Sequence, residues 1–368
     1  MKEQMDMVDQ LLGFDPRNLS AFQEKGPKQD PNIYKTNPKD SKADDGVYRS
    51  TVKVILNPFN LKESIVPQTS YYLQSQDGSR LVRSSLSIDD RNCPIFKAWK
   101  RHWFSGDEAR KEFAKKIFQQ NNSQWVLVQI LEDENKPELV GQFRVMKLAK
   151  DIYEKIITRM NPSSSSKASP YPVMDYVIGL ALNIEVQPGP DDPKAPERKQ
   201  REISYSLSNL GDYATIIKTD GTPLLTDEEI ELVDTYVNAI NDSQNGKTEK
   251  KRKDGLKALQ EVKPQIRPIY QKVADYVKEN VKDAATGEPL DVAKYCGYQP
   301  WDDNTKEFVN KWIEIADAQI DPSTISYDEF KKQQNNVTTA AVAVAETAEP
   351  EKVAEVATEA EEDDDLPF

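Results

Sequence analysis

The sequence contains very few of the residues that build catalytic and metal centres. Cysteine occurs twice among the 368 residues, as Cys93 and Cys296, and histidine once, as His102. Two cysteines so far apart indicate free thiols in a reducing compartment rather than a disulfide scaffold. A zinc site of four nitrogen and sulfur ligands cannot be assembled from these three side chains, so the sequence predicts no metal site and no cofactor.

Catalytic motifs are lacking as well. The lone His102 stands beside Trp103 in a basic run, which favours a surface or phosphate-contacting role over a general base. Gly246-Lys247-Thr248 matches the end of a phosphate-binding loop, but it follows a helical pattern where that motif requires a strand. Paired acids such as Asp89-Asp90 are typical of caps and turns rather than of a nuclease site. We therefore expect a protein that is not an enzyme.

Long apolar runs are absent too. No stretch approaches the roughly 18 consecutive apolar residues of a membrane span, and Met1-Lys2-Glu3-Gln4 lacks the apolar middle of a secretion signal. The sequence predicts a soluble intracellular protein with no membrane partner. Only 37% of the residues are hydrophobic, and 23 prolines outnumber 14 glycines, so we expect part of the chain to remain unpacked.

Charge is distributed unevenly along the chain. Of the formal net charge of −13, residues 337–368 supply −9, with ten acidic side chains and one lysine. Residues 46–220 hold 25 Lys and Arg against 21 Asp and Glu, a net charge of +4. A mildly basic middle joined to a strongly acidic end is the asymmetry that any proposed function must explain.

Hydrophobic periodicity separates an arm from a strand-rich core. Residues 1–45 begin with a short apolar helical face and then lose periodicity, which predicts an N-terminal arm. The pattern of residues 46–220 predicts short strands. It also predicts a hairpin turn at Gln76-Asp77-Gly78-Ser79 and a helical insertion at residues 95–118. This pattern suits a small closed or partly open β-barrel, so the predicted fold class is mainly β with α.

Helical spacing replaces the strand pattern beyond the core. Thr226 to Glu229 form a capping box, which opens a helical region predicted over residues 221–330. Pro264 and Pro268 are expected to break or kink its middle segment. Residues 331–368 are predicted to be a disordered acidic tail, because their composition cannot bury enough apolar area to offset the ordering entropy.

The last six residues form a distinct motif, Asp363-Asp364-Asp365-Leu366-Pro367-Phe368. A terminal Phe offers a ring for a pocket and a carboxylate for a cation, while the Asp run complements a basic rim. The alternative is a solubilising acidic tail whose final residues are incidental. This motif resembles the C-terminal tip of bacterial single-stranded DNA-binding proteins, and that resemblance implies recruitment of replication and recombination proteins.

A second, more diffuse pattern covers much of residues 46–160. Gly46-Val47-Tyr48-Arg49, Asn92-Cys93-Pro94, Trp125 to Leu131, Val140-Gly141-Gln142-Phe143-Arg144 and Ile152-Tyr153-Glu154-Lys155-Ile156 follow one another in the chain. In spacing and residue character this pattern resembles the single-stranded DNA-binding protein of T-even and related cyanobacterial phages. The resemblance implies an OB-fold core, strand coating in phage DNA replication, recombination and repair, and cooperative self-association through the arm, in the cytoplasm of an infected bacterial host.

The resemblance also implies which residues contact DNA. A protein that coats single strands needs aromatic rings on which the bases stack and cations that contact the phosphates. Neither kind of contact depends on the DNA sequence. The implied DNA-binding residues are Lys53, Lys97, Lys100, Arg101, Arg110, Lys111, Lys115, Lys116, Trp125, Phe143, Arg144 and Tyr205. For each aromatic residue, and above all for Trp125, the alternative is a place in the core.

The chain departs from the phage family at its zinc site. That family holds zinc with one His and three Cys, whereas Asn92-Cys93-Pro94-Ile95-Phe96 here has Phe96 in place of the second cysteine. We expect apolar packing around Phe96 to hold the insertion instead. Two other functions remain open: a recombination annealing protein, and an acidic-tailed adaptor that binds no nucleic acid, although the basic core disfavours the adaptor.

Overall fold

The computed structural model describes residues 30–84, 93–163, 166, 168–187, 204–296 and 300–335. Most of the predicted N-terminal arm and the acidic motif Asp363 to Phe368 lie outside these residues. The chain divides into two compact units. Unit 1 comprises Met1–Ser70, Arg83–Asp90 and Asn121–Pro300, and unit 2 comprises Tyr71–Val82, Arg91–Gln120 and Trp301–Phe368.

The fold is mixed α/β and contains an eight-stranded, mostly antiparallel sheet. The strands are β1 (Ile33–Tyr34), β2 (Tyr48–Ile55), β3 (Ile65–Leu73), β4 (Arg80–Arg83), β5 (Gln119–Asp133), β6 (Phe143–Leu148), β7 (Leu180–Val186) and β8 (Asn209–Tyr213). Their order is β1-β6-β5-β2-β7-β8, and β3 pairs with β4 and β5. The described strands leave the sheet open, so the coarse expectation of strands with helices holds and closure into a barrel is not seen.

Helices and short 3-10 segments connect these strands. The helices are α2 (Pro94–Trp103), α3 (Glu108–Ile117), α4 (Lys150–Met160), α5 (Asp227–Asn245), α6 (Glu249–Asn280), α7 (Val292–Cys296) and α8 (Asp303–Asp317), and the 3-10 segments are η2 (Pro38–Asp40), η3 (Leu61–Glu63) and η5 (Pro137–Leu139). Among the described residues no helix has both the length and the apolar content to cross a membrane.

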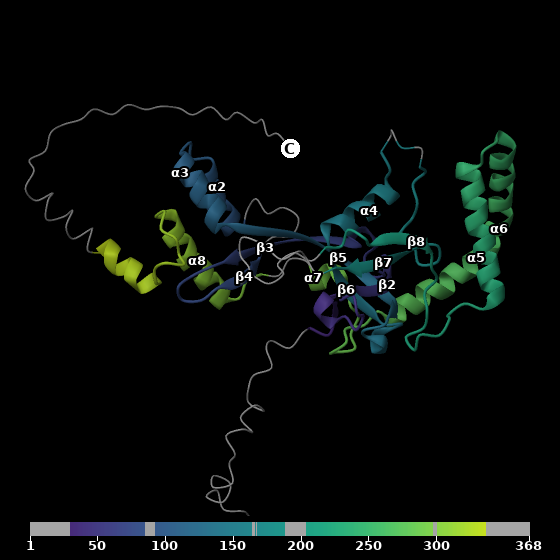
Figure 1. Ribbon diagram of the computed structural model, residues 1–368, viewed down its shortest axis with the longest axis horizontal. Coiled ribbons are helices and arrows are strands. Elements are labelled where there is room, and N and C mark those ends of the chain that lie inside the picture. The colour runs from purple at the N-terminus through teal and green to yellow at the C-terminus, as the bar shows by residue number, and fades with distance from the viewer. Residues whose placement is uncertain are drawn as a thin grey trace, which may run out of the picture. The chain divides into compact units, whose positions relative to one another are not determined.

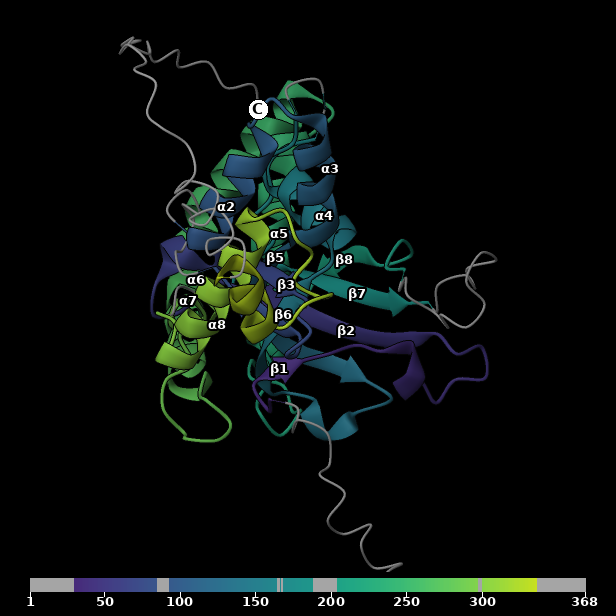
Figure 2. The ribbon, with the colours of Figure 1, turned by 90° about the vertical axis from the view of Figure 1, so that its left-hand side faces the viewer.

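The sheet of unit 1 buries both of its faces. Along β5, Trp125 and Leu127 join one core cluster, while Val126 and Val128 join the other, as the two-residue period of a strand requires. The first cluster continues into α5, α6 and α7, and the second takes in α4 through Ile152 and other residues. This double coverage explains why the middle of β5, from Trp125 to Leu131, is almost continuously apolar rather than alternating. Figure 2 shows β2 and β7 side by side in this sheet.

The first part of the predicted helical region, residues 227–280, forms an antiparallel hairpin of α5 and α6, visible in Figure 1. The capping box is confirmed, because Thr226 accepts from the Glu229 amide and Glu229 accepts from the Thr226 amide. Of the break or kink expected at the two prolines, the break is wrong, since α6 continues through Pro264 and Pro268. Both prolines are exposed, so the carbonyls they leave unbonded face water, while residues such as Ile266 bury the opposite side of the helix.

Residues 30–45, within the predicted arm, include β1, which pairs in parallel with β6. Asn32 anchors this segment by donating to Asp283 at 2.7 Å and accepting from the Ala284 amide at 2.7 Å. At the other end, residues 331–335, within the predicted tail, are helical, and Lys331 pairs with Glu314. Both ends of the folded part therefore extend beyond the predicted boundaries.

Unit 2 holds the helical insertion and α8. The buried face of α2 consists of Ile95, Ala98 and His102, and α3 buries Ala114 and Ile117. The predicted Asp77-Gly78 turn is confirmed, because Gly78 has a φ of +125° and its amide donates to Ser75 at 3.1 Å. Trp312 of α8 contacts the segment between β3 and β4, where its indole donates to the Gln74 carbonyl at 2.7 Å.

Gly141 provides a test of the packing in unit 1. A Cβ there would lie 2.2 Å from the Lys218 carbonyl oxygen, and the φ of +83° already disfavours side chains. Gly141→Ala should lower the free energy of unfolding by more than about 3 kcal/mol, measured in urea. The control Gly287→Ala has a similar φ of +75° and open space around it, so it should cost only about 1–2 kcal/mol. Equal losses would show that backbone strain alone, without the steric overlap, sets the cost at Gly141.

Candidate nucleic-acid interface

The DNA-binding residues implied by the sequence belong to both units. Unit 1 contains Lys53, Trp125, Phe143, Arg144 and Tyr205. Unit 2 contains the seven cations of the insertion, Lys97, Lys100, Arg101, Arg110, Lys111, Lys115 and Lys116. The two groups differ strongly in exposure, and this difference decides which of them can meet a strand.

Lys53 lies in the interior of unit 1 with none of its surface exposed. Its Nζ donates to the Gly179 carbonyl at 2.8 Å and to the Ala214 carbonyl. Burial lowers the pKa of Lys53 to about 7, partly countered by Asp175. The side chain is therefore used to bind the chain's own carbonyls, and its ammonium is not presented to a phosphate.

Trp125 and Phe143 are also core residues in this structure. Phe143 is 2% exposed and Trp125 is 9% exposed, and both belong to the cluster that includes Val237 of α5 and Ile269 of α6. The Trp125 indole donates to Ser123 at 3.2 Å. Since α5 and α6 contribute to the same core, neither ring offers an open face to a base.

Arg144 and Tyr205 are half-buried. The Arg144 guanidinium donates to the Phe143 carbonyl at 2.7 Å and to the Gln142 side chain, and burial lowers its pKa. Tyr205 packs against the second core cluster, and its hydroxyl lies 3.2 Å from that of Thr36. Of the predicted residues in unit 1, these two retain some access to solvent.

The insertion carries a ladder of stacked rings along α2. Trp99 stacks on Phe96 with centroids 5.3 Å apart and on Trp103 with centroids 5.2 Å apart, at interplanar angles of 30° and 25°. Phe104 meets Trp99 edge to face at 6.2 Å and is 61% exposed. The three stacked rings share one face of α2, because they follow i, i+3 and i+7 spacing, and each of them is half-buried. A nucleobase can extend such a ladder.

Cations border this aromatic ladder. Lys97 and Lys100 of α2 are exposed and have no acidic partner among the residues that the structure describes. Lys115 of α3 places its Nζ 5.8 Å from the Trp103 ring centroid while pairing with Glu112. This arrangement combines the two features that strand coating requires, aromatic faces and mobile positive charge.

The other cations of the insertion pair with acids. Lys111 pairs with Glu108 at 3.1 Å, and Lys116 pairs with Asp321 at 2.9 Å. Arg101 pairs with Asp317 at 2.5 Å, and Arg110 approaches Asp107 at 4.0 Å. Exposed pairs of this kind contribute at most about 1 kcal/mol each, so a phosphate can replace the carboxylate at little cost.

His102 is not the surface residue that its basic neighbours suggested. It is 2% exposed, and its ring lies near those of Phe113 and Phe118 at 5.5 Å and 5.9 Å. Burial lowers its pKa. The expected packing around Phe96 is also corrected, because Phe96 lies on the half-exposed ladder while Ile95, Ala98 and His102 form the buried face of α2. Cys93 is buried, and within the described ranges no group of three or more acidic, His or Cys side chains could hold a metal ion.

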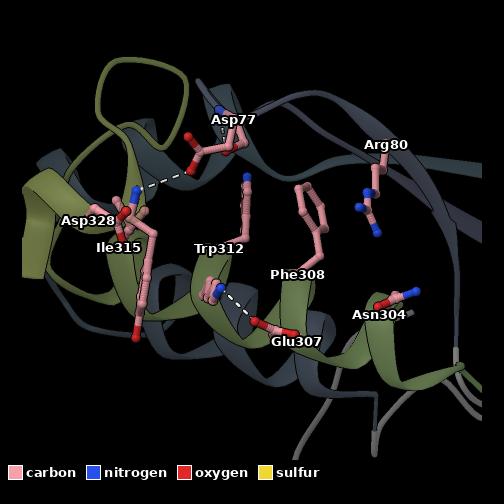
Figure 3. A pocket seen from close by; sticks show the side chains of 11 residues that line it. Asp77, Arg80, Asn304, Glu307, Phe308, Trp312, Ile315 and Asp328 are labelled. Atoms are coloured by element: carbon pink, nitrogen blue, oxygen red, sulfur yellow. Dashed lines mark hydrogen bonds and ion pairs between the residues drawn. The ribbon is translucent and has the colours of Figure 1, made fainter.

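A pocket of about 380 Å³ opens elsewhere in unit 2, beside α8 (Figure 3). The Arg80 guanidinium lies 4.6 Å from the Phe308 ring centroid, and Lys311 pairs with Glu307 at 2.6 Å. Asp77 and Asp328 also line it, so acids outnumber cations in the lining. This excess of acids does not favour the binding of a polyanion, so the pocket is not part of the candidate interface.

The ring ladder is the part of the site that the phage resemblance does not imply. Phe96, Trp99, Trp103 and Phe104 are interleaved with the basic residues of the insertion, but only those cations are implied as DNA contacts. Their helical spacing was the signal that could have identified them, because i, i+3 and i+7 positions share one face.

The buried state of Lys53 gives a test by pH. An unfolded lysine titrates near pH 10.4, so between pH 7 and 10 the unfolded chain binds more protons and wild-type stability should rise with pH by up to about 1.4 kcal/mol per unit. Lys53→Met removes this contribution, so the urea unfolding free energy of the wild type should rise more steeply between pH 7 and 9 than that of the variant. If the unfolding free energies of the two proteins change in parallel with pH, the pKa of Lys53 is not lowered by burial. The salt dependence of any DNA binding should be the same in both proteins.

A scan of the chain against protein-family models found no match, and a search of curated proteins found none either.

Proposed function

We propose that the protein binds single-stranded DNA without sequence preference and coats it during phage DNA replication, recombination and repair. The observation that supports this most is the aromatic ladder of Phe96, Trp99 and Trp103 with exposed lysines beside it. Stacking on an aromatic ring contributes roughly 1–3 kcal/mol per base and tolerates every base. The phosphates are met by Lys97, Lys100 and the exchangeable pairs of α3.

The proposed contacts differ from those that the phage resemblance implies. The proposed interface omits Lys53, Trp125 and Phe143, because all three are enclosed in unit 1. It retains the basic insertion of unit 2 and does not require Arg144 or Tyr205, which belong to unit 1. We propose that the open antiparallel sheet of unit 1 is a modified OB-type core, consistent with the order of motifs in residues 46–160.

A recombination annealing protein is the second candidate. A coating protein and an annealing protein can use the same ring ladder, because both hold unpaired bases. Complementary-strand annealing assays separate them, since an annealing protein speeds pairing of two coated strands whereas a pure coating protein slows it.

Substitutions in the insertion separate the contribution of stacking from that of charge. Trp99→Leu should weaken oligo(dT) binding by about 1–3 kcal/mol without changing the salt slope, because a ring and no charge is lost. Lys97→Gln with Lys100→Gln should instead make the logarithmic salt slope shallower by about 0.7 per lysine. Fluorescence anisotropy at several salt concentrations measures both.

The matched control for the ring is Tyr72→Leu, which removes another exposed aromatic side chain of unit 2. It should leave oligo(dT) affinity unchanged. If Trp99→Leu binds like the wild type while melting at the same temperature, the ladder is not the stacking surface and the proposed site is wrong.

The acidic C-terminal motif is proposed to recruit replication and recombination proteins. Phe368→Ala should weaken capture of such partners at least about tenfold, because a buried ring concentrates binding energy. The same substitution should leave oligo(dT) affinity nearly unchanged, since it removes no charge. Removing residues 337–368 should instead raise that affinity, most at low salt, because a tethered segment of charge −9 competes with DNA.

Pull-down with wild-type and Phe368→Ala protein decides the recruitment role. Equal recovery of partners would make the resemblance of Asp363 to Phe368 to a docking motif coincidental. A DNA affinity unaffected by the truncation would show that the acidic segment does not compete for the basic site.

A further inference from the structure

Charge is segregated along the α5–α6 hairpin. α5 has six acidic residues and no cation, and four of those acids lie in its first five residues, at the end that leads back to the sheet. At the opposite end, residues 247–257 hold six cations against Glu249 and Asp254, a net charge of +4. These cations are Lys247, Lys250, Lys251, Arg252, Lys253 and Lys257. We call residues 247–257 the hairpin tip.

The hairpin tip is built on a closely packed pair of helices. A Cβ at Gly255 would lie 2.5 Å from the Ser243 amide nitrogen, so glycine there allows the backbones of α5 and α6 to approach. Arg252 donates to the Gly246 carbonyl at 3.2 Å, and Thr248 caps α6 by accepting from the Lys251 amide at 3.2 Å. The cations therefore project from a defined scaffold.

The tip plays no part in the core that supports the rest of the hairpin. The first core cluster takes Val233 and Val237 from α5 and Ile266 and Ile269 from α6, but none of the described residues 241–261. Figure 1 shows the connection between the two helices at the end of the hairpin away from β8. Packing of the sheet thus does not account for the cations at this end.

All six cations of the tip are exposed, and most lack an acidic partner within the described part of the chain. Lys253 pairs with Glu249 at 2.9 Å, and Lys257 lies 3.9 Å from Glu261, in pairs whose side chains are all more than two-thirds exposed. Such pairs are weak and exchangeable. The helical part of the tip, residues 249–257, spans roughly 13 Å, long enough to meet several successive phosphates.

Residues 237–269 contain no aromatic residue, so the tip has no ring on which a base could stack. We propose that the hairpin tip is a second nucleic-acid contact, one that binds the sugar–phosphate backbone by charge alone and accepts duplex DNA as well as single strands. This inference rests on the proposed DNA-binding function and adds to it a site with a different substrate range.

The test compares a 20-base-pair blunt duplex with oligo(dT) of the same length. The tip variant is Lys250→Gln, Lys251→Gln and Lys253→Gln together. Its charge-matched control, in the same unit, is Lys278→Gln, Lys282→Gln and Lys294→Gln, three exposed lysines outside the tip. Thermal melting of each variant checks that the fold is retained.

At low salt the tip variant should lose duplex affinity at least tenfold, and its duplex salt slope should become shallower by about 0.9 per lysine that met a phosphate. The control should change duplex affinity less than twofold. Trp99→Leu should bind the duplex like the wild type while losing oligo(dT) affinity, because the ladder requires unstacked bases and the tip does not.

Three results would overturn the inference while leaving the proposed function in place. The wild type binds oligo(dT) but no duplex; the tip variant binds duplex like the wild type; or the control loses as much duplex affinity as the tip variant. A synthetic peptide of residues 351–368 that binds the wild type but not the tip variant, with duplex affinity unchanged, would overturn it in favour of an acidic protein segment. If the wild type binds neither oligo(dT) nor duplex, both proposals are wrong.

Discussion

Two buried polar side chains, Lys53 and Gln129, determine how unit 1 is assembled. They are cross-strand neighbours on β2 and β5, on a sheet face that is otherwise apolar. Away from water, their donors must be satisfied by the protein itself. Lys53 donates to the carbonyls of Gly179 and Ala214, and Gln129 donates to those of Gly141 and Ile217 and accepts from the Ile217 amide. The segment around residues 214–217 is thereby held against the sheet, and the α5–α6 hairpin follows it in the chain.

Coverage of this face excludes the sheet from the proposed DNA interface. A sheet whose rings pack against α5 and α6 cannot also stack bases on them, so Trp125 and Phe143 stabilise the fold. The same aromatic chemistry recurs on α2, where only one side of the helix is needed for packing and the other keeps Phe96, Trp99 and Trp103 half-exposed. The requirement for stacking and charge is thus met in the insertion, while the sheet supplies a scaffold.

Local features of the fold could be predicted from the sequence, and features set by distant contacts could not. The Thr226 capping box and the Asp77-Gly78 turn were identified correctly, because each depends on a few adjacent residues. The burial of Lys53 and His102 was missed, because a charged or titratable side chain is normally exposed and only tertiary contacts show otherwise. Pro264 and Pro268 do not break α6, because packing of residues such as Ile266 against the core stabilises the helix there.

The distribution of charge reconciles a net charge of −13 with the proposed binding of a polyanion. Electrostatic attraction at moderate salt extends only about 8–10 Å, so a strand responds to nearby cations rather than to the total charge of the chain. The acids of α5 gather where the hairpin meets the rest of unit 1, whereas the cations of the hairpin tip stand at its other end. The cations of α2 and α3 likewise lie among aromatic rings. An acidic chain can therefore present basic surfaces, provided that its acids and its cations gather at different ends of the same elements.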